Sequence, residues 1–195
     1  MRLTKITTHN GDDGLSHLAD GTKILKNHQI FHALGDLDEL NSFVGFLIAN
    51  MQNFQNFQNL QNFQNLQNNF LADFLPELTQ IQRNIFDFGG QIAMQDFAKF
   101  AKNNAEKITN LENLIAKIQQ NLSPLREFIL PSGHILASQC HLCRSIARRC
   151  ERSLVDLLNE HNREIFIYIN RLSDFFFVLS RWINKNFEQQ ELFWK

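Results

Sequence analysis

The fold is decided by the stretch His141-Leu-Cys-Arg144-Ser-Ile-Ala-Arg148-Arg149-Cys-Glu151-Arg152 and by the residues on either side of it. Small and apolar residues recur here at alternating steps of four and three, which is the spacing of the buried seam of a packed helix. The seam consists of Leu136, Cys140, Cys143, Ala147, Cys150, Leu154 and Leu157. The stretch therefore predicts a helix over residues 135–160 with one face in a core.

The same helix carries Arg144, Arg148 and Arg152 at positions i, i+4 and i+8, so their guanidinium groups form one row. Guanidinium groups are planar and always charged, and each can bind two oxygens of a phosphate at once. A second polar segment, Asn170-Arg-Leu-Ser-Asp174, follows along the chain. Together the two segments predict an anion-binding site between helices.

Composition limits the classes of function. The 195 residues predict one domain, and 19 basic against 20 acidic side chains give a net charge of −1. Such a chain has no overall attraction to nucleic acid or to an anionic membrane, and no run approaches the ~18 apolar residues of a membrane span. We therefore expect neither nucleic acid nor a membrane among its partners.

The three cysteines favour a reducing compartment. Their odd number argues against a disulfide framework. Cys140 and Cys143 form a C-x-x-C pair that leaves zinc as an alternative, but their place on the apolar seam favours buried thiols. The N-terminus is too polar for a signal peptide, so we expect a cytoplasmic protein.

Four more segments repeat apolar residues with helical spacing, over residues 36–49, 77–95, 106–121 and about 165–183. Their apolar faces are Leu37, Leu40, Val44 and Leu47; Leu78, Ile81, Ile85, Phe88 and Ile92; Ile108, Leu111, Ile115 and Ile118; and Ile165, Ile169, Leu172, Phe176, Leu179 and Ile183. Five such faces are best buried in an antiparallel bundle, so the predicted fold is all-α with five helices.

Two regions lack this pattern. Residues 1–35 hold four glycines among polar residues and predict an ordered loop. Residues 51–69 repeat Gln-Asn-Phe or Gln-Asn-Leu with a period of three, and such residues drift around a helix by about 60° per step. This low-complexity tract predicts a helix end or an exposed connection, without a catalytic role.

The segment 7–16 is a candidate phosphate loop. Its glycines allow close approach of the backbone, its N–H groups can surround an anion, and its hydroxyls can donate. An ordinary Gly-Asp turn is the alternative. Lys23 and Lys26, just beyond it, either add positive charge to the loop or are solvated surface residues.

Other candidate residues also have two interpretations. Asp38 either complements a helix dipole or pairs with an arginine of the central helix. Phe128, in Phe128-Ile-Leu-Pro131-Ser-Gly133, belongs to a loop on the core or faces a hydrophobic ligand. Asn170 and Asp174 either join two helices by hydrogen bonds or line a site.

In this order along nearly the whole chain, the segments resemble the PduO-type ATP:cob(I)alamin adenosyltransferases. The matching segments are Thr8-His-Asn-Gly11-Asp12-Asp13-Gly14, Gly35-Asp-Leu-Asp38-Glu39-Leu40-Asn41-Ser42, Ile81-Gln82-x-x-Ile-Phe86-Asp87-x-Gly89, Phe128-Ile-Leu-Pro131-x-Gly133, residues 141–152 and residues 170–174. The chain departs from the family pattern at His9-Asn10, at Leu15 and at Ser132.

The resemblance implies a ferritin-like five-helix bundle, assembled as a homotrimer with ATP at the subunit interfaces under the N-terminal region 1–35. The implied ATP-binding residues are Thr8, Asn10, Gly11, Asp12, Gly14, Ser16, Lys26, Arg148, Glu151 and Arg152. Arg144 would pair with Asp38 across or near the interface. Phe128 would lie under the corrin ring, supported by Asn170 and Asp174, and the catalytic residues would be Arg148, Phe128, Asp38 and Arg144.

The implied reaction transfers the 5′-deoxyadenosyl group of ATP to the cobalt of reduced cobalamin, giving adenosylcobalamin and triphosphate. Mg²⁺ would be held by the ATP phosphates without an assigned protein ligand. A separate reductase would supply electrons, and an adenosylcobalamin-dependent enzyme is a further expected partner. The alternative is a cobalamin carrier or nucleotide sensor without turnover, which Leu15 favours. A di-metal bundle would need paired Glu-x-x-His motifs, which the sequence lacks.

Overall fold

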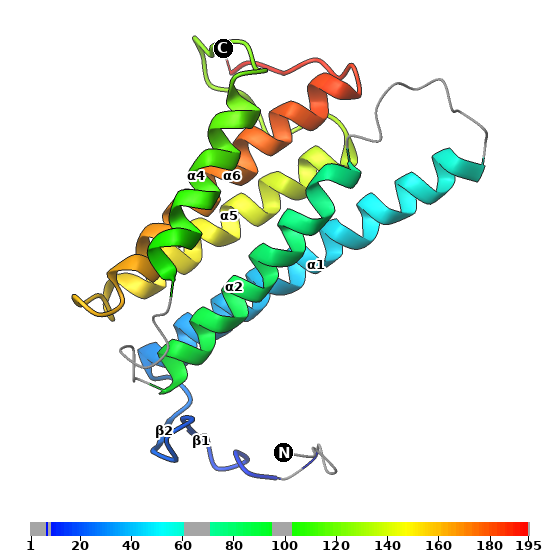
Figure 1. Cartoon of the computed structure of the whole chain (residues 1–195). Coiled ribbons are helices and arrows are strands. Elements are labelled where there is room, and N and C mark those ends of the chain that lie inside the picture. The colour runs from blue at the N-terminus through cyan, green and yellow to red at the C-terminus, as the bar shows by residue number, and fades with distance from the viewer. Residues whose placement is uncertain (1–6, 8, 61–70, 95–102, 195) are drawn as a thin grey trace.

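The chain folds as a helical bundle in a computed structural model that describes residues 7, 9–60, 71–94 and 103–194. This part of the chain contains five α-helices: α1 (Gln29–Leu60), α2 (Leu75–Met94), α4 (Asn104–Gln119), α5 (Ile135–Val155) and α6 (Arg163–Asn186). A single 3-10 turn, η1 (Ala72–Phe74), precedes α2. The predicted all-α, five-helix architecture is confirmed (Figure 1).

Four helices surround the core and the fifth covers it. Helix α5 packs against α1 and α6, and α1 packs against α2. The ring closes between α2 and α6, where Asn84 Nδ2 donates a 3.0 Å hydrogen bond to the Tyr168 hydroxyl. Helix α4 packs on α6. Because α4 meets the bundle from outside, Ile108 and Ile115 are only half-buried there.

The predicted seam of α5 is buried from Leu136 to Leu154, including all three cysteines. Leu157 is only partly buried because α5 ends at Val155, five residues before the predicted end. Polar side chains end the helix there. Asn162 Nδ2 donates to the Leu157 carbonyl at 2.7 Å, which gives this backbone a partner outside the helix.

Helix α1 is longer at both ends than the sequence predicted. It begins at Gln29, so residues 29–35 are helical rather than part of a loop. Ile30 and Ala33 are buried and extend the apolar face backward. At the other end α1 continues into the Gln/Asn-rich tract as far as Leu60, as the helix-end interpretation predicted; residues 61–69 lie outside the described part of the chain.

The N-terminal region contains a small hairpin that the sequence analysis missed. Strands β1 (Leu15–His17) and β2 (Lys23–Leu25) pair antiparallel. The hairpin is tied to the end of α2, where the Ala19 N–H donates to the Ala93 carbonyl at 3.2 Å. Three-residue strands are too short to show a clear alternating pattern in the sequence.

The C-terminal residues after α6 pair with the segment before α5. Ile129 and Phe193 form a single antiparallel bridge, and the Trp194 N–H donates to the Phe128 carbonyl at 2.8 Å. Arg181, which is 8% exposed, anchors this tail by a 2.6 Å ion pair with Glu191.

No helix in the described ranges is both long enough and apolar enough to cross a membrane.

Gly133 is required where the chain enters α5. Its φ is +99°, and a Cβ atom there would lie 2.2 Å from Asn184 Oδ1. That oxygen accepts the His134 N–H at 2.9 Å, and Asn184 Nδ2 donates to the Ser132 carbonyl at 3.1 Å. A side chain at position 133 would disrupt both hydrogen bonds between this turn and α6.

Gly133→Ala is expected to lower the free energy of unfolding by about 2–4 kcal/mol, from backbone strain and the lost Asn184 bonds. Gly35→Ala is the control, because Gly35 lies inside α1 with open space around its Cβ position. It should be neutral or stabilising by up to about 1 kcal/mol. Urea unfolding measures both; similar values for the two variants would contradict the account.

Candidate functional site

A hollow of about 510 Å³ lies between α5, α6 and the segment before α5. It brings together four residues that the sequence analysis selected from three separate segments: Phe128, Arg144, Arg148 and Asp174. Its full lining consists of Leu125, Arg126, Glu127, Phe128, Ile129, Pro131, His141, Arg144, Arg148, Ser173, Asp174 and Phe177.

Phe128 stands at the edge of this hollow. It is 79% exposed, so Phe128 is not packed on the core. The alternative interpretation of this segment, a loop that packs on the core, therefore does not hold for Phe128. Its backbone is held by the hydrogen bond from Trp194. An aromatic ring that is left in water beside a hollow is available to an apolar ligand.

Arg144 gives the hollow a positive wall. Its guanidinium carbon lies 5.7 Å from the centre of the Phe177 ring, which is a cation–π contact. Burial lowers the pKa of Arg144, and the neighbouring charge of Arg148 lowers it further, while Asp174 acts in the opposite direction. Two guanidiniums thus share the hollow with the Asp174 carboxylate, and an anionic ligand would relieve their repulsion.

The row of arginines extends along α5 beyond the hollow. Arg148 and Arg152 are both exposed. The row runs toward the end of α5 that meets the beginning of α1, where Gln29 Nε2 donates to the Ser153 carbonyl at 2.6 Å. The arginines therefore connect the hollow with the end of the bundle from which the N-terminal hairpin projects (Figure 1).

Glu151 and Asn170 meet one another beside the row. Asn170 Nδ2 donates to Glu151 Oε1 at 2.7 Å, and Asn170 Oδ1 accepts from Arg171 at 2.9 Å. Asn170 thus joins α6 to α5, which was the structural alternative for this residue. It is not among the residues that line the hollow, although Asp174, one turn later, is.

The carboxylate that pairs with α5 is Asp36, not Asp38. Asp38 is exposed and lines a different hollow, of about 240 Å³, between α1 and α2. Within this single chain Asp38 and Arg144 therefore lie apart, because a shift of two residues turns a side chain to another face of the helix. A contact between them across a subunit interface stays a prediction.

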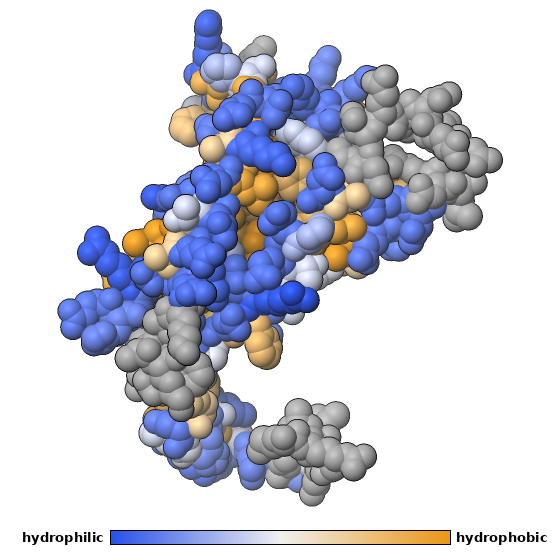
Figure 2. All heavy atoms as spheres, viewed as in Figure 1, coloured by the Kyte–Doolittle hydropathy of each residue, from blue (hydrophilic) through white to orange (hydrophobic). Residues whose placement is uncertain are grey.

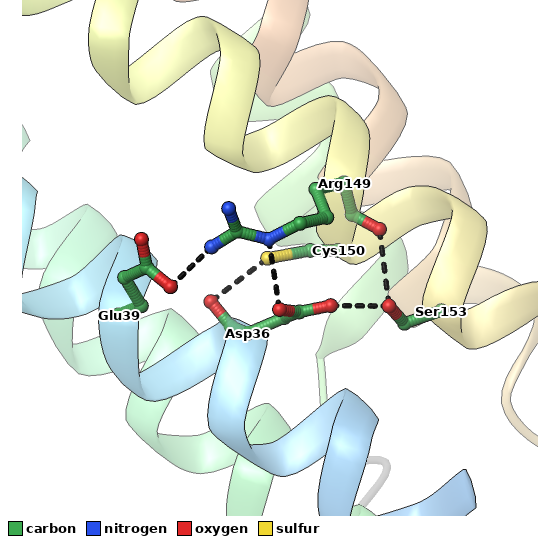
Figure 3. Close-up of polar contacts among 5 residues, drawn as sticks. All are labelled: Asp36, Glu39, Arg149, Cys150 and Ser153. Carbon is green, nitrogen blue, oxygen red and sulfur yellow. Dashed lines mark hydrogen bonds and ion pairs between the residues drawn. The ribbon is translucent and has the colours of Figure 1, made fainter.

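Asp36 is the centre of a polar clamp between α1 and α5, made of Asp36, Glu39, Arg149, Cys150 and Ser153 (Figure 3). Arg149 Nε donates to Asp36 at 2.9 Å, and a terminal nitrogen of Arg149 bonds Glu39. Ser153 Oγ also donates to Asp36, and Cys150 Sγ donates to the Asp36 carbonyl at 3.0 Å. The hydrogen bonds to Glu39 and Asp36 raise the pKa of Arg149.

The polar clamp fixes how α5 is rotated about its axis. Arg149 is held against α1, so Arg148, its neighbour in the sequence, is directed to another side of the helix. Arg149 had no predicted role, because it lies outside the row of Arg144, Arg148 and Arg152, whose members are four residues apart.

The N-terminal loop is folded on itself. The Lys26 N–H donates to the Gly14 carbonyl at 2.9 Å, and a Cβ atom on Gly11 would come within 2.9 Å of Lys26 Nζ. Lys26 and Gly11 are therefore together, as expected for one phosphate-binding loop. Ser16 lies in β1 opposite Ile24. Asn10 and Asp12 are exposed, and Thr8 lies outside the described residues.

Lys23 is engaged differently from Lys26. Its ammonium group contacts Asp13 at 2.9 Å, and this hydrogen bond lowers the pKa of Asp13. Figure 1 shows the hairpin projecting from one end of the bundle, away from the segment that carries Phe128. A single chain therefore does not close its own loop over its own hollow.

The cysteines have no exposed thiol. Cys140, Cys143 and Cys150 are each fully buried. Burial raises the pKa of Cys143 and of Cys150 to about 12, so both are thiols at neutral pH. The predicted burial is confirmed, and such thiols are poor nucleophiles.

Two residues of the hollow were missed in the sequence. His141 and Phe177 both line it. His141 is three residues before Arg144, and Phe177 is three residues after Asp174, so each is on the same helix face as a selected residue. That spacing was the available signal.

The chain is similar to known proteins in sequence and in fold. The sequence pattern of the family described as Cobalamin adenosyltransferase matches residues 6–183. A cobalamin adenosyltransferase of Cupriavidus metallidurans is 35% identical over 100% of this chain and 96% of its own length. The human corrinoid adenosyltransferase MMAB is 33% identical over 100% of this chain and 75% of its own length.

A solved structure shares the whole fold. It is a variant of the PduO-type ATP:corrinoid adenosyltransferase from Lactobacillus reuteri, complexed with cobalamin and ATP. It superposes with a TM-score of 0.82 at 32% identity, over 98% of this chain and 99% of that one.

The polar clamp gives a stability prediction. Asp36→Ala should lower the free energy of unfolding by about 1–2 kcal/mol, because it removes a half-buried acceptor from both Arg149 and Ser153. Glu39→Ala is the matched control on the same arginine; its exposed pair should contribute no more than about 0.5 kcal/mol. Chemical denaturation measures both. A loss for Glu39→Ala as large as that for Asp36→Ala would contradict the assignment of Asp36 as the centre.

Proposed function

The chain belongs to the cobalamin adenosyltransferase family, and on this premise we propose how its own residues carry out the reaction. It is an ATP:corrinoid adenosyltransferase, which transfers the 5′-deoxyadenosyl group of ATP to the cobalt of reduced cobalamin and leaves triphosphate. The observation that carries the residue assignment is the convergence of Phe128, Arg144, Arg148 and Asp174 on one hollow.

The hollow binds one face of the corrin, with Phe128 under the cobalt. The exposed ring of Phe128 supports this role. A phenyl ring can neither coordinate a metal nor hold a water molecule that would. Cobalt that lacks a lower ligand is easier to reduce, so this contact favours formation of Co(I). Asp174 and the Asn170–Glu151 pair support the same wall.

The arginine row and the N-terminal loop bind the triphosphate. Arg148, Glu151 and Arg152 lie on α5, and the loop supplies Thr8, Asn10, Gly11, Asp12, Gly14, Ser16 and Lys26. In the reaction the electron pair of Co(I) forms a bond to C5′ of ATP, and the C5′–O bond breaks with its electrons on the leaving triphosphate. Negative charge grows on that group, so nearby guanidiniums stabilise the transition state more than the ground state. No general base is required.

Mg²⁺ accompanies the nucleotide. Phosphate oxygens of ATP would hold the ion, and no protein ligand is assigned to it. When bound it neutralises phosphate charge.

The active unit is a homotrimer in which neighbouring subunits complete each site. Asp38 lies in an apolar groove beside Phe86, whose side chain is 75% exposed. Arg144 faces a different hollow, and the N-terminal loop projects away from its own Phe128. A second subunit on the groove would bring Asp38 to a partner's Arg144 and would bury Phe86.

Other partners and the location follow from the chemistry. The reaction consumes Co(I), so an external reductase must supply one electron to cob(II)alamin. An adenosylcobalamin-dependent enzyme receives the product. Three buried free thiols are compatible with the cytoplasm, where thiols stay reduced.

Arg148→Ala is expected to lower kcat about 10²–10³-fold, the typical effect of removing a charge that stabilises the transition state. Arg163→Ala, an exposed arginine of α6 that does not line the hollow, is the control and should keep wild-type turnover. The assay is anaerobic formation of adenosylcobalamin from cob(II)alamin, reductant, Mg²⁺ and ATP, followed by absorbance. Wild-type protein that binds ATP without forming product would favour the carrier or sensor function instead.

Asp38→Arg is expected to convert the trimer to monomers, because it places two cations at one interface. The double variant Asp38→Arg with Arg144→Asp restores opposite charges and should recover the trimer. Light scattering after size-exclusion chromatography measures both masses. A trimer in the single variant would rule out this contact.

A further inference from the structure

His141 is a buried polar residue of the hollow whose side chain lacks hydrogen-bond partners among the described residues. It is 5% exposed, and neither ring nitrogen has a hydrogen-bond partner within the described part of the chain. Native proteins leave few buried polar atoms unpaired, because such atoms lose their bonds to water and gain nothing in return. An imidazole with both nitrogens unpaired therefore indicates a partner outside the described part of the chain.

The surrounding groups do not supply that partner. The ring lies edge-on to Phe177, with 6.4 Å between the ring centres. The charged groups that act on it are Arg144 on α5 and Glu191 on the C-terminal tail. Glu191 is already engaged by Arg181 through two contacts, at 2.6 and 3.3 Å.

His141 is a neutral ring at pH 7. Burial lowers its pKa, Arg144 lowers it further, and Glu191 opposes them. A neutral imidazole offers one N–H donor and one acceptor nitrogen. It is therefore suited to a neutral group that both donates and accepts. A phosphate would instead be drawn to the guanidiniums of Arg144 and Arg148, which share the hollow.

We propose that His141 is a corrinoid-binding residue, whose imidazole hydrogen bonds to a side-chain carboxamide of the corrin ring. This inference rests on the proposed function, which places the corrin in this hollow. Primary carboxamides surround the macrocycle, and each has a carbonyl acceptor and an N–H₂ donor.

His141 lines the hollow, so a carboxamide of a corrin that is bound there is within reach of the imidazole. Phe128 at the edge of the hollow is 79% exposed. Its segment is held to the tail by two backbone hydrogen bonds, from Trp194 N–H to the Phe128 carbonyl at 2.8 Å and from Leu130 N–H to the Leu192 carbonyl at 2.7 Å.

His141→Leu tests the proposal, because it keeps the volume and removes both nitrogens. The thermal midpoint of the apo protein should rise, because an unpaired buried group is replaced by an apolar one. The Kd for cob(II)alamin, measured by calorimetry, should increase about tenfold, while the Kd for ATP stays within twofold. A merely structural histidine would give a lower midpoint instead.

Gln139→Leu is the matched control. Gln139 is also buried on α5 with an unpaired side-chain oxygen, but it does not line the hollow. Its cob(II)alamin affinity should remain wild-type. A corrinoid whose carboxamides are replaced by methyl esters provides the second comparison. Esters cannot donate, so His141→Leu should weaken binding of this analogue less than it weakens binding of cob(II)alamin.

These measurements distinguish a failure of the proposed function from a failure of the role proposed for His141. Wild-type protein that fails to bind cob(II)alamin would overturn the proposed function itself. Wild-type binding with an unchanged Kd in His141→Leu would overturn only the inference. The inference would also be overturned if His141→Leu weakened binding of the ester analogue as much as binding of cob(II)alamin, or if it lowered the thermal midpoint of the apo protein. An increase in the Kd for ATP as large as that for cob(II)alamin would overturn it too and would assign His141 to the nucleotide.

Discussion

Helix α5 must bury one face completely and hold a row of charges on another, and the rest of the molecule depends on this constraint. Ten of its residues, from Leu136 to Leu154, are at or below 6% exposure, while arginines recur at every fourth position on the outside. The division holds only if the helix cannot rotate. Arg149 provides that restraint from the boundary between the two faces, through Asp36 and Glu39 on α1. Packing of the buried face determines which side of α5 is turned inward, and this ion pair adds a restraint on its rotation.

Periodicity predicted most of the fold, because burial of a helix face leaves a repeating pattern in the sequence. The core residues of α2, α5 and α6 were correctly identified. The ends of elements were less predictable, because they depend on single hydrogen bonds. After α5, the side chain of Asn162 bonds the Leu157 carbonyl. At the other site, α1 extends into a tract whose three-residue period does not fit a helix face, and there the Phe54 ring packs on the His134 ring, with 4.9 Å between the ring centres. Tertiary packing outweighed the local pattern there.

The candidate site was predictable where its residues share a motif and unpredictable where they meet only in space. Arg144 and Arg148 followed from spacing alone. Asp36 and Asp38 are two residues apart in one acidic run, and nothing in that run shows which carboxylate faces α5. Apolar side chains also reach the surface of the bundle. Figure 2 shows them between hydrophilic residues on the visible face. Phe86 and Phe128 are exposed on this chain, and we propose that a second subunit covers the first and the corrin covers the second.

The backbone hydrogen bond between Trp194 and Phe128 places a fluorescent side chain next to the hollow. Of its two tryptophans, Trp194 is 65% exposed and hydrogen bonded to the residue that we place beneath the cobalt, whereas Trp182 lies against Phe74 in the bundle. Corrinoids absorb light in the range where indole emits. Resonance energy transfer would therefore quench Trp194 when the ring arrives, and the chain carries a built-in fluorophore for occupancy at the mouth of its own binding cavity.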